Sequence, residues 1–229
     1  MYEEFSDKVV FITGGSTGIG KTTAEAFSRW AARVIICARN SNKAEPLLYL
    51  AQQQSWQLKY MQADVANSEN IKAVISHIIQ YDGSLDSAFN NADVDGELCR
   101  IADYSIEGWQ KTIAINLSGV FYCLKYEIEQ MLKQTSGAII NYISVSGHKG
   151  YPGDVGYISN KHGLTGLTKA ASMEYADKNI RINGISPGVI RTPMTDKDRD
   201  KAEDYKAWIK KVEPMKRIGE PHEVTETVL

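Results

Sequence analysis

The sequence has few cysteines and no excess of basic residues, and both shortages exclude classes of protein. Its three cysteines, Cys37, Cys99 and Cys123, are widely spaced. Their odd number and spacing argue against a disulfide framework or a zinc site, and the four histidines show no metal-ligand spacing. With 26 basic and 28 acidic residues the net charge is −2, so no general basic surface recruits nucleic acid or anionic lipid. We therefore expect no metal and no nucleic-acid partner.

Long apolar runs are also missing. No run approaches the roughly 18 residues that a membrane-spanning helix needs. The first residues, "MYEEFSDKVV", are acidic and lack the apolar core of a signal peptide. Hydrophobic residues make up 43% of the chain and charged residues 24%, which is ordinary for a globular protein. These features predict a cytoplasmic protein, and residues 1–229 are enough for one large domain.

Short apolar runs alternate with helical stretches along the chain. Each run has few charges and several β-branched residues, as in strands that are covered on both faces. The expected strands are 9–13, 33–38, 58–65, 85–92, 137–144 and 180–186. The expected helices are 19–31, 43–54, 68–81, 107–133 and 157–177. This alternation predicts an α/β fold, a doubly wound parallel sheet with helices on both faces.

One segment interrupts the alternation. Residues 195–217, "TDKDRDKAEDYKAWIKKVEPMKR", are dense in charge and follow the sixth expected strand. As structure, the pattern is typical of a solvated amphipathic helix. As function, it fits a lid over a substrate cleft, which we place at about 188–215.

The glycine-rich stretch "GGSTGIGKTT", residues 15–24, fits two phosphate-binding motifs. Gly15-x-x-x-x-Gly20-Lys21-Thr22 matches the loop of nucleoside triphosphatases. Gly14-x-x-x-Gly18-x-Gly20 matches a turn that seats a dinucleotide pyrophosphate. Either motif places phosphate at a helix N-terminus, where free N–H groups and the helix dipole favour an anion, although such a turn is sometimes purely structural.

The triphosphatase interpretation needs a magnesium-binding aspartate at the end of an apolar strand. Asp64 and Asp86 are poor candidates, because neither follows its strand in that way. The dinucleotide interpretation gains support further along the chain.

Tyr157 and Lys161 stand four residues apart at the start of an expected helix, so their side chains share one face. Ser144 ends a strand and can point into the same cleft. A free tyrosine has a pKa of about 10, too high for acid or base work at neutral pH. A nearby lysine ammonium favours tyrosinate and lowers that pKa. The three residues can therefore transfer a proton without a metal, although the Tyr-x-x-x-Lys pattern alone is common by chance.

Several motifs in order and at matching spacing resemble the short-chain dehydrogenase/reductase family from Asp7 to the end. They are "TGGSTGIG" (13–20), "ADV" (63–65), "NNA" (90–92), "INLSGVF" (115–121), "SVSG" (144–147), "YISNK" (157–161) and "PGVIRTPM" (187–194). The stretches "AFNNADVDGE" and "RIGEPHEV" resemble its bacterial glucose dehydrogenase-like, or general oxidoreductase, branch. The resemblance implies a Rossmann fold and an oxidoreductase that moves a hydride between a nicotinamide cofactor and a small alcohol or carbonyl substrate.

The resemblance also implies roles for single residues. Tyr157 would be the general acid or base, Lys161 would lower its pKa and bind the nicotinamide ribose, and Ser144 would orient the substrate oxygen. Asn116 would hold a water that links Lys161 to solvent. The implied cofactor-binding residues are Gly14, Ser16, Thr17, Gly18, Ile19, Gly20, Arg39, Asp64, Val65, Asn91, Ala92, Tyr157, Lys161, Pro187, Gly188, Ile190 and Thr192.

The end of the second expected strand favours NADP(H) over NAD(H). An NAD site usually has an acid about 20 residues past the glycines, on the ribose 2′-hydroxyl. Here the strand ends in Arg39 and Asn40, and the only acid between Gly20 and Glu45 is Glu25, inside the first helix. The Arg39 guanidinium suits a 2′-phosphate. NAD(H) stays an alternative, because an arginine at this place also stacks on adenine in some relatives.

Three departures from the family pattern stand out. The usual Asn-Asn-Ala-Gly ends here in Asp93, whose charge we expect near the cofactor phosphates, and the usual Tyr-x-Ala-Ser-Lys reads Tyr157-Ile158-Ser159-Asn160-Lys161. The chain stops at Leu229 inside an expected helix, before the family's final edge strand. That strand usually joins subunits into tetramers, so a homodimer is expected ahead of a homotetramer.

These departures keep a second hypothesis open. It is a truncated or drifted relative that binds dinucleotide without efficient catalysis, as a sensor or a partner subunit. The joint presence of Asn116, Ser144, Tyr157 and Lys161 favours the enzyme.

Overall fold

Six parallel strands form one sheet in the computed structural model, which describes residues 5–196 and 202–229. The strand order is β3-β2-β1-β4-β5-β6, so the direction of winding reverses between β1 and β4. The strands are β1 Val9–Thr13, β2 Arg33–Ala38, β3 Leu58–Gln62, β4 Ser87–Asn90, β5 Gly137–Tyr142 and β6 Ile180–Ile185. Every pairing between neighbours is parallel, as the sequence predicts.

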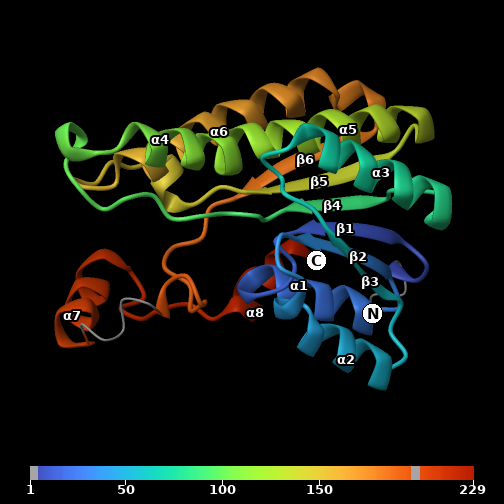
Figure 1. Ribbon diagram of the computed structural model, residues 1–229, viewed down its shortest axis with the longest axis horizontal. Helices are drawn as coiled ribbons and strands as arrows, with labels where there is room; N and C mark the ends of the chain where they lie inside the picture. Colours follow the sequence, from blue (N-terminus) through green and yellow to red (C-terminus); the bar gives the residue numbers. More distant parts are fainter. Residues whose placement is uncertain (1–4, 197–201) are drawn as a thin grey trace.

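Helices cover both faces of the sheet (Figure 1). They are α1 Gly18–Arg29, α2 Glu45–Gln53, α3 Ser68–Asp82, α4 Ile106–Ile113, α5 Gly119–Gln134, α6 Val155–Glu174, α7 Ala202–Val212 and α8 Pro221–Val228. Helices α3 to α6 lie on one side of the sheet, and α1, α2 and α8 lie on the other (Figure 1). The predicted doubly wound α/β architecture is therefore confirmed.

The strand β1 shows why the sheet needs cover on both faces. All five of its residues are buried. Val9 and Phe11 belong to the apolar core under α3, α5 and α6, whereas Val10 and Ile12 belong to the core under α1, α2 and α8. Because successive strand side chains point to opposite faces, an uninterrupted apolar run fills both cores.

The expected helix over 107–133 is divided in the structure. Helix α4 ends at Ile113, a π-helical turn spans Ala114–Ser118, and α5 begins at Gly119. A Cβ on Gly119 would lie 2.9 Å from a side-chain carbon of Val65, so glycine lets the helix approach the loop after β3 closely. Single π-helical turns often occur at functional sites.

The charged segment contains a helix, α7, which Figure 1 shows to one side of the sheet. Residues 197–201 of the expected lid lie outside the described residues. Helix α8 follows and packs on α1, with a capping box between Glu220 and Glu223. Strand β6 forms one edge of the sheet. In the described part of the chain, no helix has the length and apolar character needed to cross a membrane.

Candidate active site

A cavity of about 260 Å³ opens at the carboxyl ends of β1, β2 and β4. This is where the winding reverses, the place at which open α/β sheets bind ligands. The cavity is lined by Gly14, Ser16, Thr17, Gly18, Ile19, Cys37, Ala38, Arg39, Asn40, Lys43, Ala63, Asp64, Val65, Asn91, Ala92, Asp93, Val94, Ile115, Tyr142, Thr192, Pro193 and Met194. Most of the expected cofactor residues thus meet at one place.

The glycine loop between β1 and α1 has the backbone geometry of a phosphate-binding turn. Gly14 and Gly18 have φ angles of +65° and +54°, which other residues adopt only with strain. A Cβ on Gly14 would lie 2.9 Å from the Ala92 Cα. At the start of α1, Thr17 makes no side-chain capping bond and the first turn holds no acid. The helix therefore presents its backbone N–H groups and its dipole to an anion.

Asn91 and Gly20 support this loop from behind. The Asn91 Nδ2 donates to the carbonyl oxygens of Thr13, at 3.0 Å, and Gly14, at 3.3 Å. A Cβ on Gly20 would lie 2.5 Å from that nitrogen, so only glycine fits. Gly20 does not line the cavity, and its expected place in cofactor binding becomes support of the loop.

The two residues that the triphosphatase motif needs face elsewhere. The Lys21 ammonium lies 3.5 Å from Glu25 on the same helix. The Thr22 hydroxyl donates to the carbonyl oxygen of Gly18 at 3.1 Å. Neither residue lines the cavity, so the motif lacks its phosphate and magnesium contacts here.

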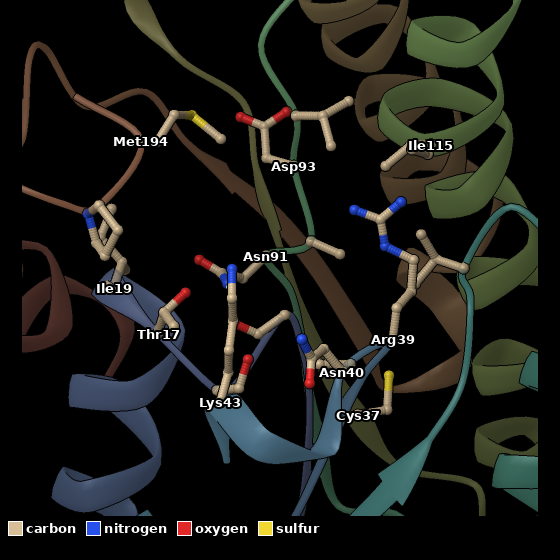
Figure 2. A pocket seen from close by; sticks show the side chains of 18 of the residues that line it. Thr17, Ile19, Cys37, Arg39, Asn40, Lys43, Asn91, Asp93, Ile115 and Met194 are labelled. Atoms are coloured by element: carbon tan, nitrogen blue, oxygen red, sulfur yellow. The ribbon is translucent and has the colours of Figure 1, made fainter. Parts of the chain in front are cut away.

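Two cations reach the cavity near the end of β2. Figure 2 shows the side chains of Arg39 and Lys43 extending into it. Neither forms an ion pair with another residue in the described ranges. Lys43 was not predicted from the sequence, although its position four residues after Arg39 was a usable signal. On the facing side, Asp64 turns inward and accepts a hydrogen bond from the Ala66 N–H at 3.0 Å.

Tyr157 and Lys161 lie on the first turns of α6. The Lys161 side chain is 1% exposed, and its Nζ donates to the Tyr142 carbonyl oxygen at 3.0 Å. The same nitrogen lies 5.1 Å from the centre of the Tyr157 ring. The expected pair therefore meets on one helix face, but neither residue lines the cavity among the described residues.

Ser144 follows β5 in an unusual backbone conformation. Its φ of 148° and ψ of 158° fall in a region that only glycine adopts without strain. The Ser144 Oγ accepts a hydrogen bond from the Ser146 N–H at 3.1 Å. The Ser144 hydroxyl lowers the pKa of Tyr157, against the larger rise caused by burial. The expected role of Ser144 in orienting the substrate oxygen stays a prediction.

Asp93 stands between the cavity and the Tyr157–Lys161 pair. Its Oδ2 accepts a hydrogen bond from the Tyr157 hydroxyl at 2.8 Å and lies 3.1 Å from the Lys161 Nζ. Figure 2 shows Asp93 near Met194, at the opposite end of the view from Lys43. We expected this charge beside the cofactor phosphates. It lines the same cavity as the glycine loop, and its Oδ2 contacts the tyrosine and the lysine.

The Asp93 carboxylate adds a negative charge beside Tyr157 and Lys161. Burial raises the pKa of Tyr157 well above the ordinary tyrosine value, and the Asp93 charge adds to the rise. Burial lowers the pKa of Lys161, and the Asp93 charge opposes that change. Burial also raises the pKa of Asp93, against the effect of Lys161. The expected lowering of the Tyr157 pKa by Lys161 stays a prediction, and the Asp93 carboxylate lies 3.1 Å from the ammonium that would cause it.

Asn116 lies in the π-helical turn and clamps the same loop. Its Nδ2 donates to the Val94 carbonyl oxygen at 2.8 Å, and its Oδ1 accepts from the Val94 N–H at 3.0 Å. Both polar atoms of the side chain are therefore occupied by the residue next to Asp93. The side chain positions the loop, and the expected water link to Lys161 stays a prediction.

The residues after β6 divide between two cavities. Thr192 lines the cavity beside the glycine loop, but Pro187, Gly188 and Ile190 line a separate one near α8. A Cβ on Gly188 would lie 2.5 Å from a carboxylate oxygen of Glu213. Of the four residues after β6 that were expected to bind the cofactor, only Thr192 thus faces the cavity.

The cavity residues fit a dinucleotide with phosphates. The uncapped start of α1 offers N–H groups to a pyrophosphate, and the space that Gly14 leaves open lets the backbone approach it. Arg39 and Lys43 offer positive charge to a further phosphate. No group of three or more side chains suited to a metal ion occurs in the described parts of the chain.

Comparison with known proteins gives a consistent result. The family model described as short chain dehydrogenase matches residues 8–203. The cyclohexanol dehydrogenase of Acinetobacter sp. (strain SE19) is 39% identical over 100% of this chain and 88% of its own length. The crystal structure of levodione reductase superposes with a TM-score of 0.92 at 32% identity, covering 98% of this chain and 90% of the other. The structure of ElxO with NADP bound superposes with a TM-score of 0.90 at 33% identity, covering 96% and 89%.

Proposed function

The chain belongs to the short-chain dehydrogenase family, and we propose that it transfers a hydride between NADP(H) and a small alcohol or carbonyl compound. The observation that carries this proposal is that a cavity holding a phosphate-binding loop is also lined by Asp93, whose carboxylate contacts both Tyr157 and Lys161. A nucleotide and a proton-transferring tyrosine are the two components that such a reaction needs.

In this proposal the glycine loop and the start of α1 hold the pyrophosphate, and Arg39 and Lys43 hold the 2′-phosphate. The residues proposed along the rest of the cofactor are Asp64, Val65, Asn91, Ala92 and Thr192. When bound, the nicotinamide supplies or accepts the hydride. Arg39 and Lys43 line the cavity and favour NADP(H). The 2′-phosphate, which a cation would bind, is the group that distinguishes NADP(H) from NAD(H).

Tyr157 moves the proton. In reduction its hydroxyl donates a proton to the carbonyl oxygen as the hydride arrives at carbon, and in oxidation the tyrosinate takes the alcohol proton. Ser144 donates a hydrogen bond to the same substrate oxygen. Lys161 stabilises the negative charge that Tyr157 acquires when it gives up its proton.

The substrate class follows from similarity to the cyclohexanol dehydrogenase. We take cyclic secondary alcohols and their ketones as the first compounds to assay. Met194 and Ile115, which lie with Asp93 toward one end of the cavity in Figure 2, give apolar surface to such a ring.

Self-association belongs to the same proposal. Phe121 and Leu132 on α5 and Met173 on α6 are 49%, 39% and 83% exposed. Apolar side chains exposed on adjacent helices favour a homodimer through that face.

The cofactor assignment is tested by equilibrium titration with NADPH and with NADH, followed by nicotinamide fluorescence. Arg39→Ala and Lys43→Ala should each weaken NADPH binding about tenfold and leave NADH binding nearly unchanged, because a charge-assisted bond to phosphate is lost. Lys21→Ala is the control, since Lys21 pairs with Glu25 away from the cavity. Tighter binding of NADH by the unaltered protein would contradict the NADP(H) assignment.

A further inference from the structure

The buried carboxylate of Asp93 has no part in the function proposed so far. Its side chain is 6% exposed, and one of its oxygens, Oδ2, engages both Tyr157 and Lys161. The other oxygen, Oδ1, has no hydrogen-bond partner among the described residues. A buried carboxylate with one unsatisfied oxygen is costly for folding. Its placement against the two proton-transferring residues points to a functional reason.

The contact with Tyr157 has a defined direction. A phenol hydroxyl has one proton to donate. Here the Tyr157 hydroxyl donates it to Asp93 Oδ2, and the two oxygens are 2.8 Å apart. Ionisation of Tyr157 would break this bond and leave two negative oxygens side by side. The bond therefore stabilises the protonated form of Tyr157.

The contact with Lys161 acts in the same direction. An ammonium that stands alone beside a tyrosine favours tyrosinate. Here the ammonium lies 3.1 Å from the Asp93 carboxylate, within an ordinary ion pair. The pair is close to neutral as seen from Tyr157, so most of the help that Lys161 gives to ionisation is cancelled.

We propose that Asp93 is a positioning residue that keeps Tyr157 protonated. Carbonyl reduction would then persist to alkaline pH, whereas alcohol oxidation would require alkaline pH. The proposal rests on the proposed function for its catalytic consequence. The underlying effect, control of the Tyr157 proton by Asp93, is a property of the chain itself.

Other titratable groups around Tyr157 do not replace Asp93 in this role. Tyr142 on β5 is itself buried, and its pKa is raised by burial and then by Asp93 and Asp95. Asp154 before α6 has a pKa raised to about 6 by burial, Asp95 and Asp93, so it is mostly charged at neutral pH. Among the described contacts, only Asp93 bonds to the Tyr157 hydroxyl itself and pairs with Lys161.

The test measures the ionisation of Tyr157 directly, without cofactor or substrate. The chain has 12 tyrosines, so the ring-carbon NMR signal of labelled Tyr157 is assigned by its loss in Tyr157→Phe. In the unaltered protein this signal should show no ionisation until the protein unfolds in alkali. In Asp93→Asn, which keeps the shape and the acceptor oxygen, it should ionise at a pH lower by roughly one to three units.

Asp93→Gly removes the whole side chain and serves as the second variant should the amide disturb folding. Asp103→Asn is the control, because Asp103 is an exposed carboxylate outside the cluster. An unchanged Tyr157 titration in both Asp93 variants would overturn the proposal.

The catalytic consequence has its own readout. The pH profile of kcat/KM for cyclohexanol oxidation should move toward lower pH in Asp93→Asn, in the same direction as the NMR titration, which a merely structural role would not produce. If the NMR titration shifts but neither the unaltered protein nor any variant transfers hydride, Asp93 controls the ionisation of Tyr157 and the proposed function is rejected. A profile that stays in place while the NMR titration moves would overturn the catalytic part of the proposal.

Discussion

At the residue scale, substitutions of Ser144 distinguish the effect of its strained backbone on stability from the effect of its hydroxyl on activity. A φ of 148° costs a non-glycine residue about 1 to 3 kcal/mol. Ser144→Gly relieves that strain, whereas Ser144→Ala keeps it, and both lose the hydroxyl. We expect Ser144→Gly to be more stable than Ser144→Ala by about 1 kcal/mol, after the extra entropy of unfolded glycine is subtracted.

Urea denaturation of the two Ser144 variants measures the difference. Both should lose most of the hydride-transfer activity, because the hydrogen bond to the substrate oxygen is gone. Equal stability of the two variants would show that the serine backbone is not strained.

Single residues also show where sequence reasoning ends. The proximity of Tyr157 and Lys161 was predictable, because a four-residue spacing on a helix is a local feature. The bond from Tyr157 to Asp93 was not, since it joins residues 64 positions apart and depends on how the β4 loop crosses α6. The departure at Asp93 was visible in the sequence, but its partners were not.

At the scale of elements, the glycine loop is the part whose geometry is most constrained. Gly14→Ala would place a Cβ at 2.9 Å from the Ala92 Cα and force a φ of +65° on alanine. We expect a loss of about 1 to 2 kcal/mol in stability and weaker NADPH binding. The matched change is Gly166→Ala, in the exposed middle of α6 with nothing within 4 Å of the added Cβ. It should raise stability by about 0.5 to 1 kcal/mol.

Thermal unfolding and NADPH titration of both glycine variants check this contrast. A Gly14→Ala protein that binds NADPH as tightly as the unaltered chain would contradict the role given to the loop.

Elements were predicted better than their ends. Strands β1 and β2 have the expected bounds because turn residues flank their apolar runs, whereas β3 ends at Gln62, short of the expected residue 65. The division of the expected helix 107–133 was missed. The division lies where Gly119 approaches Val65 closely, a tertiary contact that leaves no mark in the helical periodicity.

At the scale of the whole molecule, the buried carboxyl of Glu127 should make stability depend on pH. Burial raises its pKa from 4.5 to about 8, against the hydrogen bond from Asn90. In the unfolded chain Glu127 releases its proton near pH 4.5, whereas the folded protein holds it until about pH 8. The free energy of unfolding should therefore fall as the pH rises through this window.

The side chain introduced by Glu127→Gln is neutral at every pH, so this variant should lose that dependence. The free energy of unfolding of the variant should therefore exceed that of the unaltered protein by a margin that grows from pH 4.5 to about pH 8. The control is Glu129→Gln on the same helix, whose partner Lys125 lies at the surface. Urea denaturation across this pH range measures both. The position had a signal in the sequence, because Glu127 falls on the apolar stripe of α5 with Cys123 and Leu124.

The central claim is that this molecule transfers hydride with Tyr157 as its proton donor. The direct measurement is NADPH oxidation in the presence of cyclohexanone, by the unaltered protein and by Tyr157→Phe, with NADPH binding measured on both. We expect turnover by the unaltered protein and a loss of about 100-fold or more in Tyr157→Phe, with NADPH binding retained. Equal turnover by the two proteins would contradict the claim.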